Sequence, residues 1–561
     1  MKNSIKFLKK HVSLACLLSM ALFLSACTKK FDDINTDKNA LANLGSDQLP
    51  FLFSTAEANG TNSGWAYQVA QNLFHDQYAQ YFANTTTYFP SDRLVIRMDW
   101  IGSLWSPLYT TTMPQLQTLM EKYDPASAES ALANIWWVIA FQRVTDTWGP
   151  IPYFHAGEAA FSVPYDPQDQ IYDDFFKRLA ASVAILKGKT GETPYGGFDL
   201  IYGGSVSKWI KFANTLRLRL AIRVSKVDPA RGKTEGEAAV ADGVMTTSPD
   251  DDALIEKSIV NGDVNGLSVM DWNEFRMSSA MSSVLNGYKD PRLPVYFNPT
   301  KSSWQANELA NGKAKTDDGS NFDPADLAHP LKYHGLRNGL LPGDMTHPLN
   351  TADNNSRHGE RWNSAGAGVT FIGKSYGGGQ ATPSNVMAAA EAYFLRAEGV
   401  LLGWNMGGGT AKEYYEGGIK ASMNQWGITD DAEITAYINS TNTPIPPGDD
   451  QSSPALSTVP VLFGATLDVQ LQQVAIQKWL ALYPDGNEGW ADIRRSGQLK
   501  LYPVVNSDNP DLPLHPTADQ RIRRINFMTS EIQTNGAEVK KAIPLLGGDD
   551  KITTPLWWDK N

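Results

Sequence analysis

Apolar residues recur at α-helical spacing in two distant parts of the chain, and this pattern constrains the fold most. The helices that it predicts cover residues 127–145, 209–220, 387–401, 411–421 and 466–482. In the 209–220 stripe the apolar offsets are 0, 3, 4, 7 and 11, the pattern of a helix with one buried face. The opposite face carries Lys211, Arg217 and Arg219, which we expect to be exposed to solvent. A mostly α-helical fold is therefore predicted.

The predicted helices at 387–401 and 411–421 form a candidate helix pair. A glycine-rich turn at 407–409 connects them, and the second helix carries small residues at Gly417 and Gly418. Residues without a large side chain let two backbones approach closely. A helix, a short turn and a second helix with small contact residues resemble a tetratricopeptide unit.

Residues 227–385 differ from the helical parts. Gly, Asn, Asp and Pro are dense there and helical patterns are short, so we predict a loop-rich insertion. Short strands are expected at 293–297 and 369–374 within it. Irregular segments of this length in a folded protein are commonly functional. Single aromatic residues in polar surroundings indicate the same for this insertion.

The first 26 residues have the features of a secretory signal. Four lysines lie within the first ten residues, and the apolar run at 12–24 that follows is too short to span a bilayer. Small residues then precede a cysteine at 24–27, which is similar to the lipobox of bacterial lipoproteins. In that class the cysteine is acylated, so we predict lipidation at Cys27.

The predicted organisation is therefore a signal peptide at 1–26, a lipidated tether at 27–46 and one helical domain at 47–561. Cys16 leaves with the signal peptide, so the mature chain has no disulfide and depends on its apolar core. No later segment is apolar enough to span a membrane, so we expect the protein to be anchored.

The charge balance excludes one class of partner. Removing residues 1–26 takes four lysines from the 49 basic residues and leaves all 60 acidic ones, so the net charge changes from −11 to −15. Nucleic-acid binding depends on basic patches that displace counterions. We therefore expect no nucleic-acid partner, and we expect the lipid to be the membrane tether.

Several segments together resemble one family, the RagB/SusD surface lipoproteins of Bacteroidetes, and within it the second SusD-like subgroup. The segments that carry the resemblance are 31–37, 143–153, 209–214, 390–398, 490–495 and 555–559. They occur in the family's order and extend over essentially the whole mature chain.

The resemblance implies a fold and a role. The fold would be mostly α, with four tetratricopeptide-like helix pairs as a scaffold, long irregular loop insertions and a few short strands. The protein would lie at the outer membrane and face the cell exterior. Its role would be capture of a nutrient, most often an oligosaccharide, and its delivery to a TonB-dependent transporter of the SusC type. Members of this family bind their ligands and catalyse no reaction.

Motifs of known enzyme classes do not assemble in this sequence. Lys-Thr-Gly at 189–191 precedes Ser-x-x-Lys at 205–208, the reverse of the order in serine penicillin-interacting enzymes. The eight histidines form no His-Glu-x-x-His motif, and an EF-hand-like start at Asp33 lacks the required Gly and Glu. We predict no enzymatic activity, no metal and no cofactor, while a calcium site built from loop oxygens remains compatible with the sequence.

Aromatic residues outside the helical stripes are the candidate ligand contacts. Aromatic rings present large apolar faces at low entropic cost, which suits stacking on sugar rings. The loop and first helical turn within 85–105 supply Tyr88, Phe89, Arg93 and Trp100, in a region that lies near the ligand surface in the family. The other candidates are Trp65, Trp272, Trp304, Trp362 and Tyr376. Loop packing and a transporter interface are alternative roles for each.

The leading hypothesis is thus a surface lipoprotein that binds a glycan. A second hypothesis keeps the architecture but makes the ligand a peptide, which would favour a less aromatic surface. A surface polymer hydrolase and a structural lid with little affinity for cargo are further alternatives.

Overall fold

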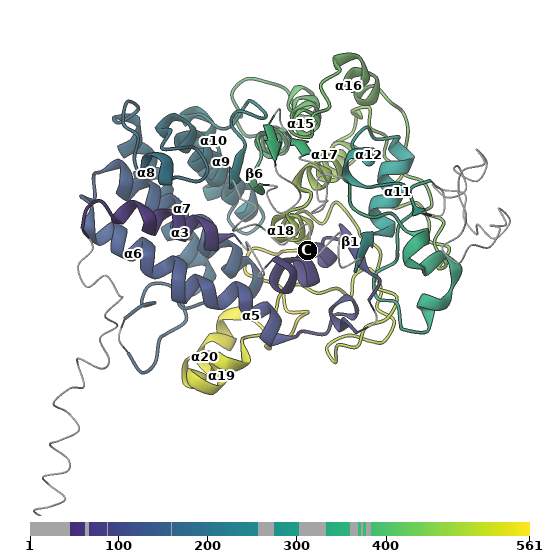
Figure 1. Ribbon diagram of the computed structural model, residues 1–561, viewed down its shortest axis with the longest axis horizontal. Helices are drawn as coiled ribbons and strands as arrows, with labels where there is room; N and C mark the ends of the chain where they lie inside the picture. Colours follow the sequence, from purple (N-terminus) through teal and green to yellow (C-terminus); the bar gives the residue numbers. More distant parts are fainter. Residues whose placement is uncertain are drawn as a thin grey trace, which may run out of the picture. The chain divides into compact units, whose positions relative to one another are not determined.

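Helices make up most of the part of the chain that the computed structural model describes (Figure 1). The described residues are 45–61, 67–86, 88–158, 160–255, 274–301, 332–359, 369–371, 374–376 and 383–561. Residues 51–561 form one compact unit. Cys27 and most of the predicted tether lie outside the described residues.

The helical elements fall into two groups along the chain. The first comprises α3 (Leu49–Gly60), η1 (Tyr67–His75), α4 (Asp76–Tyr78), η2 (Pro90–Arg93), α5 (Met98–Pro107), η3 (Leu108–Thr112), α6 (Met113–Lys122), α7 (Ala128–Trp148), α8 (Gln168–Lys187), η4 (Gly196–Phe198), α9 (Val206–Val224), α10 (Pro229–Asp242), α11 (Ser279–Tyr288) and α12 (Leu293–Tyr296). The second comprises η7 (Asp344–Thr346), η8 (Pro348–Asn350), η9 (Ala352–Asn354), α14 (Ala389–Leu401), α15 (Ala411–Gln425), α16 (Asp431–Ile438), α17 (Leu467–Leu482), α18 (Gly486–Ser496), α19 (Thr529–Thr534), α20 (Gly536–Ala542) and η12 (Ile543–Leu546).

Strands are short and pair two by two within the described residues. The antiparallel pairs are β1 (Phe82–Asn84) with β3 (Phe275–Met277), β2 (Ala253–Ile255) with β6 (Ser384–Met387), and β4 (Val369–Phe371) with β5 (Lys374–Tyr376). In the first pair Ala83 faces Arg276, so the chain after η1 lies beside a segment almost 200 residues later. A mostly helical fold with a few strands is as predicted.

The predicted helices form where their local signals place them. α7 covers the predicted stretch 127–145 and begins at Ser127, whose side chain accepts a hydrogen bond of 3.1 Å from the amide of Ser130. α15 begins with a capping box between Thr410 and Glu413. α17 matches the predicted stretch 466–482.

Consecutive helices pack as pairs, α7 with α8, α9 with α10, α14 with α15 and α17 with α18. The predicted small-residue contact of α14 and α15 is confirmed. A Cβ atom added to Gly418 would lie 2.7 Å from the Phe394 ring, and one added to Gly417 would lie 2.8 Å from the Tyr393 ring. The two backbones approach this closely because glycine leaves room for the rings.

The prediction that the charged face of α9 is exposed to solvent is wrong. Arg219 is buried and forms two hydrogen bonds of 2.6 Å with the Glu391 carboxylate of α14. Arg217 is also buried and pairs with Glu235 of α10. Lys211 is half-buried and pairs with Asp251. The helix is enclosed on several sides, so its charges are neutralised inside the protein.

Other local predictions also differ from the structure. Residues 293–296 form the short helix α12, which has Pro294 in its first turn, instead of a strand. α10 and α11 lie inside the stretch 227–385 that was expected to be loop-rich. Within the strand expected at 369–374, residues 369–371 form β4, and residue 374 begins the separate strand β5 that pairs with it. Met387, assigned to a helical stripe, belongs to β6.

The tail after α17 contains further helices. α18 begins at Gly486, because Asp485 caps it and accepts a hydrogen bond from the amide of Glu488. α19 and α20 follow later in the tail.

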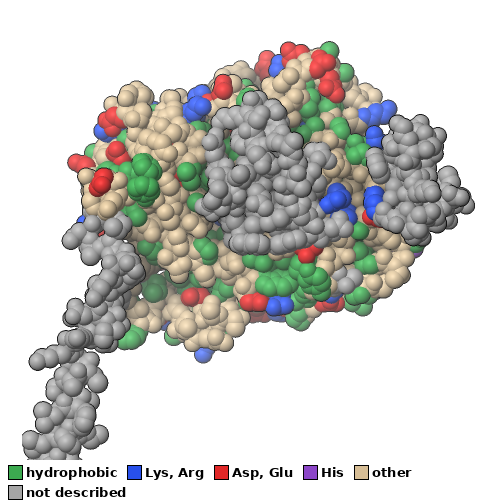
Figure 2. Space-filling view, in the orientation of Figure 1, with side chains coloured by type: hydrophobic (Ala, Val, Ile, Leu, Met, Phe, Trp, Pro, Cys, Tyr) green, Lys and Arg blue, Asp and Glu red, His purple; other side chains and the backbone are tan. Residues whose placement is uncertain are grey.

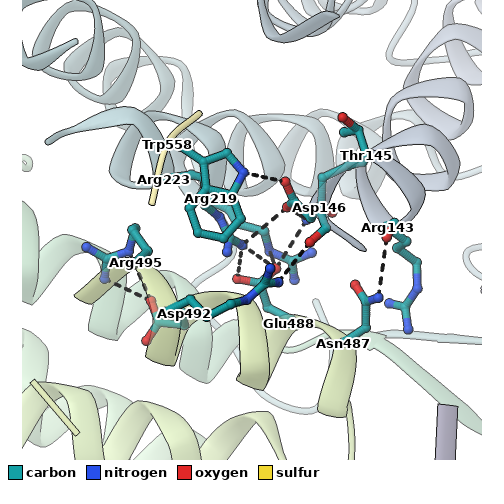
Figure 3. A network of polar contacts seen from close by, with 12 residues as sticks. Arg143, Thr145, Asp146, Arg219, Arg223, Asn487, Glu488, Asp492, Arg495 and Trp558 are labelled. Atoms are coloured by element: carbon teal, nitrogen blue, oxygen red, sulfur yellow. Dashed lines mark hydrogen bonds and ion pairs between the residues drawn. The ribbon is translucent and has the colours of Figure 1, made fainter. Parts of the chain in front are cut away.

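A buried network of polar contacts links these helices (Figure 3). The Arg223 guanidinium of α9 lies 2.5 and 2.6 Å from the two carboxylate oxygens of Glu488 in α18. Trp558, near the end of the chain, donates a hydrogen bond of 2.8 Å to the carboxylate of Asp146 in α7. All four side chains are buried. The network therefore connects α7, α9, α18 and the C-terminal segment inside the protein.

A second part of this network joins α14, α17 and α18. The Lys478 ammonium lies 2.8 Å from both Glu398 and Asp492, and Arg495 bridges the same two carboxylates. Although burial alone would raise the pKa of Asp492, Lys478 and Arg495 together hold this pKa well below its usual value. The segments that carry the family resemblance thus meet mostly in the scaffold interior.

Candidate functional site

An open hollow of about 580 Å³ lies where η1, the turn before η2, the start of α5 and the chain before β3 meet. Its lining residues are Gln68, Val69, Leu73, Tyr88, Phe89, Trp100 and Glu274. We call this the aromatic hollow. It combines three aromatic rings with two polar side chains, and its residues come from positions about 200 apart in the sequence.

The aromatic rings are arranged in a row. The Phe89 ring centroid lies 4.3 Å from that of Tyr88 and 5.7 Å from that of Trp100. Phe89 itself is buried and stacks on Phe275 of β3 at 6.3 Å, so it forms the wall of the hollow. Tyr88 is 66% exposed, and the Arg97 guanidinium lies 4.5 Å from the Trp100 ring centroid. The Phe89 wall is thus buried, while the Tyr88 ring is open to solvent.

Glu274 organises the polar side of the aromatic hollow. One carboxylate oxygen accepts a hydrogen bond of 2.8 Å from the Tyr88 hydroxyl, and the other accepts one of 2.8 Å from the Gln68 amide. The Glu274 carbonyl accepts hydrogen bonds from the amide and hydroxyl of Thr85. Glu274 therefore holds the Tyr88 ring, the Gln68 amide and the loop before η2 in one arrangement.

The protonation of these groups follows from their surroundings. Burial raises the pKa of Glu274, while its hydrogen bonds from Tyr88 and Gln68 act in the opposite direction. Burial and the neighbouring Glu274 carboxylate raise the pKa of Tyr88 to about 12. The Tyr88 hydroxyl thus keeps its proton at neutral pH and remains a hydrogen-bond donor.

Three of the predicted ligand residues, Tyr88, Phe89 and Trp100, come together in the aromatic hollow. Arg93 lies outside its lining. The Arg93 guanidinium lies 2.6 Å from the Asp508 carboxylate, and the Asp508 amide donates a hydrogen bond of 2.9 Å to the Arg93 carbonyl. Arg93 therefore anchors η2 to the C-terminal tail.

The remaining predicted residues are not placed by the structure. Trp65, Trp272, Trp304 and Trp362 lie outside the described residues, and Tyr376 lies in β5, of which only the backbone is described. Four lining residues were missed by the sequence analysis, namely Gln68, Val69, Leu73 and Glu274. No local pattern identifies them, because the strand pairing of β1 with β3 brings Glu274 to this position.

The lining of the aromatic hollow is suited to binding. Glu274 is the one carboxylic acid among its described residues, whereas glycoside hydrolysis generally uses two carboxyl groups that flank the bond. Within the described part of the chain, no three His, Cys, Asp or Glu side chains are grouped so that they could hold a metal ion.

Charged side chains of both signs lie on the face shown in Figure 2, where Lys and Arg side chains form small groups among neutral and acidic surface. None of the helices in the described residues combines the length and apolarity that crossing a membrane requires.

Comparison with known proteins decides the family. A family model described as SusD-like, starch-binding and associating with the outer membrane matches residues 42–516. The chain belongs to the SusD-like family. The resemblance drawn from the six sequence segments is thereby confirmed. None of the curated proteins matches this SusD-like chain.

Solved structures of SusD-like proteins share its fold over most of their length. A chitin-binding SusD homolog from Flavobacterium johnsoniae is 33% identical with a TM-score of 0.77, and the alignment covers 91% of this chain and 99% of that one. A SusD-like protein from Bacteroides thetaiotaomicron and a SusD homolog from Bacteroides uniformis are each 28% identical, with TM-scores of 0.74 and the same coverage.

Proposed function

We propose that this SusD-like protein binds a glycan in the aromatic hollow and delivers it to a SusC-like transporter in the outer membrane. The observation that carries the proposal is a row of aromatic rings, one of them exposed, beside hydrogen-bonded polar groups. Sugar rings offer apolar C–H faces to such rings. Their hydroxyl groups can exchange hydrogen bonds with Gln68, Tyr88 and Glu274.

Chitin oligosaccharides are the first ligands to test. The relative from Flavobacterium johnsoniae that is 33% identical is described as chitin-binding, which supports this choice. The acetamido group of each N-acetylglucosamine unit both donates and accepts hydrogen bonds. In the hollow, the Gln68 amide can donate and accept such hydrogen bonds, and the Glu274 carboxylate can accept them.

Calorimetric titration of chitobiose and chitohexaose into the mature protein tests the proposal. Trp100→Ala is expected to weaken binding about tenfold or more, because a central aromatic contact commonly contributes 1.4 kcal/mol or more. Phe51→Ala is the control, since Phe51 is also an exposed aromatic residue and does not line the hollow. Binding of peptides, with no binding to a panel of glycans, would support the peptide alternative and contradict the proposal.

We also propose that the protein is not an enzyme. Incubation of the purified protein with chitohexaose is expected to leave the oligosaccharide intact, as seen by chromatography. Appearance of shorter products that scales with protein concentration would contradict this proposal and favour the hydrolase alternative.

We further propose that lipidation at Cys27 anchors the protein to the outer membrane, facing the cell exterior. Cys27→Ser removes the acylated thiol, so the protein is expected to move from the membrane fraction to the soluble fraction. Labelling with a fatty acid analogue should be lost in parallel. Retention of both the label and the membrane association would contradict the proposed anchor. Co-purification of a transporter barrel with the tagged wild-type protein tests the proposed partner.

A further inference from the structure

The aromatic hollow continues into a groove along α5. A second hollow of about 630 Å³ shares Val69 with it and is lined by residues of α5 and of the chain around α19. A third hollow of about 470 Å³ shares Ser106 and Ser530 with the second. Figure 1 shows α19 and α20 beside α5. We call the second and third hollows together the α5 groove.

The third hollow contains an unusually placed aromatic residue. Phe161 is fully exposed to solvent and lines this hollow together with Trp105 and Tyr109. The Tyr109 hydroxyl donates a hydrogen bond of 2.9 Å to the Pro152 carbonyl, which fixes its ring. An exposed large apolar side chain often marks a binding surface when it lies in a concave, partly polar setting.

The loop that carries Phe161 is anchored on its C-terminal side. The Asn535 side chain accepts a hydrogen bond from the Val163 amide and donates one to the Val163 carbonyl. The Ser162 hydroxyl donates to Glu538, and the Tyr165 hydroxyl donates to Glu531. The chain that follows Phe161 is therefore anchored, while the Phe161 ring itself is exposed.

The middle of the α5 groove is polar. Ser106 and Ser530 are exposed, and the Ser103 and Gln533 side chains add a hydroxyl and an amide. Such groups donate and accept hydrogen bonds without carrying charge, which matches the hydroxyl-rich edge of a neutral sugar. The groove thus combines aromatic rings with polar groups, as the aromatic hollow does, and its lining includes the acidic residue Asp99 as that of the hollow includes Glu274.

The groove is longer than a single sugar ring. Tyr109 lies nine positions after Trp100, which corresponds to about 14 Å along a helix axis. An oligosaccharide bound at Trp100 can therefore extend past Ser106 toward Phe161. Continuity between the three hollows favours one extended ligand over a separate one.

We infer that the α5 groove binds the continuation of the same glycan chain, with Phe161 stacking on a distal sugar ring. The inference rests on the proposed glycan binding and adds a second contact region to it. A second contact region makes the affinity for a glycan depend on the length of the oligosaccharide, because only a long oligosaccharide reaches both regions.

Calorimetry with two chitin oligosaccharides separates the two regions. Wild-type protein should bind chitohexaose at least about tenfold more tightly than chitobiose. Phe161→Ala should weaken chitohexaose binding about fivefold, as expected for the loss of one ring contact of about 1 kcal/mol, and leave chitobiose binding unchanged. Ser106→Trp, which fills the junction of the second and third hollows, should have the same selective effect. Phe51→Ala is again the matched exposed control.

The outcomes distinguish this inference from the proposed function. Equal affinities for both oligosaccharides, with loss of binding only in Trp100→Ala, would overturn the inference and leave the proposed function intact. Loss of transporter co-purification in Phe161→Ala, with chitohexaose binding unchanged, would identify the groove as a protein interface and also overturn it. Absence of glycan binding by the wild-type protein would contradict the proposed function itself.

Discussion

Glu274 holds Tyr88 and Gln68 from two sides of the aromatic hollow, because each of its carboxylate oxygens accepts one hydrogen bond from these side chains. The neighbouring Phe89 is buried, so it can position Tyr88 and Trp100 without adjusting to a ligand. A site prepared in this way loses little side-chain entropy when a ligand binds.

Glu57 is a carboxyl group in a very different setting, the interior of the protein. It is completely buried in α3, and its Oε2 accepts a hydrogen bond of 2.8 Å from the Leu200 amide. Burial, and secondly the nearby Asp199 carboxylate, raise the pKa of Glu57 well above its ordinary value of 4.5. The stability that this group contributes is complete below that ordinary value and is lost as pH rises through the raised pKa.

Glu57→Gln replaces this group with a neutral one of the same shape. The variant is therefore expected to be more stable than the wild type at pH 8, by about 1 kcal/mol or more, with a smaller difference at pH 5. Urea unfolding at both pH values measures the effect. Glu121→Gln at an exposed position is the control. A wild type that stays as stable as the variant at pH 8 would refute the assignment.

Pairs of helices are the elements from which this fold is built. Gly417 and Gly418 face the Tyr393 and Phe394 rings. The contact of α14 with α15 therefore requires residues without a side chain at these two positions. The sequence predicts this contact because small residues at consecutive positions of a helix are a local pattern. By contrast, α12 was predicted as a strand because a four-residue apolar run carries too little periodicity to distinguish the two structures.

Gly418→Ala tests the packing of this helix pair. The new Cβ atom would lie 2.7 Å from the Phe394 ring, which is enclosed, so neither side can move away freely. A loss of about 1–3 kcal/mol in the free energy of unfolding is expected, in spite of the better helix propensity of alanine. Gly191→Ala, where a Cβ atom meets nothing within 4 Å, should change stability by less than about 0.5 kcal/mol. Equal stability of the two variants would show that the contact is not tight.

At the scale of the whole molecule, buried charges connect helices that are far apart in sequence. Arg219 and Glu391 are 172 residues apart, and Arg223 and Glu488 are 265 apart. Removing one partner of such a pair leaves an uncompensated buried charge, which is strongly destabilising. The end of the chain joins this network through Trp558, so the C-terminal segment belongs to the folded interior (Figure 3).

Two adjacent tryptophans test the role of the C-terminal segment. Trp558 is completely buried and donates a hydrogen bond to Asp146, whereas Trp557 is half-buried. Trp558→Ala is expected to reduce the free energy of unfolding by about 3–5 kcal/mol, because it leaves a cavity and removes one hydrogen bond to the Asp146 carboxylate. Trp557→Ala should cost about 1 kcal/mol. Thermal unfolding compares the two, and similar losses would contradict the central position of Trp558.

Some properties of this protein follow from the sequence alone. The helices expected at 127–145, 209–220 and 411–421 form as α7, α9 and α15, and the glycine contact of one helix pair and the SusD-like family were also predicted correctly. The grouping of Tyr88, Phe89 and Trp100 was also anticipated, since these residues lie within 13 positions. Each of these features depends on periodicity, capping or proximity along the chain, which are local.

The tertiary structure decided which charges are buried and which residues complete the site. Arg219 belongs to an apparently solvent-facing stripe, and only its contact with Glu391 reveals that this stripe is interior. Glu274 reaches Gln68 across 206 residues through a strand pairing that carries no strong sequence signal. Burial and pairing are set by contacts between distant segments, and the local pattern of one segment does not contain the position of another.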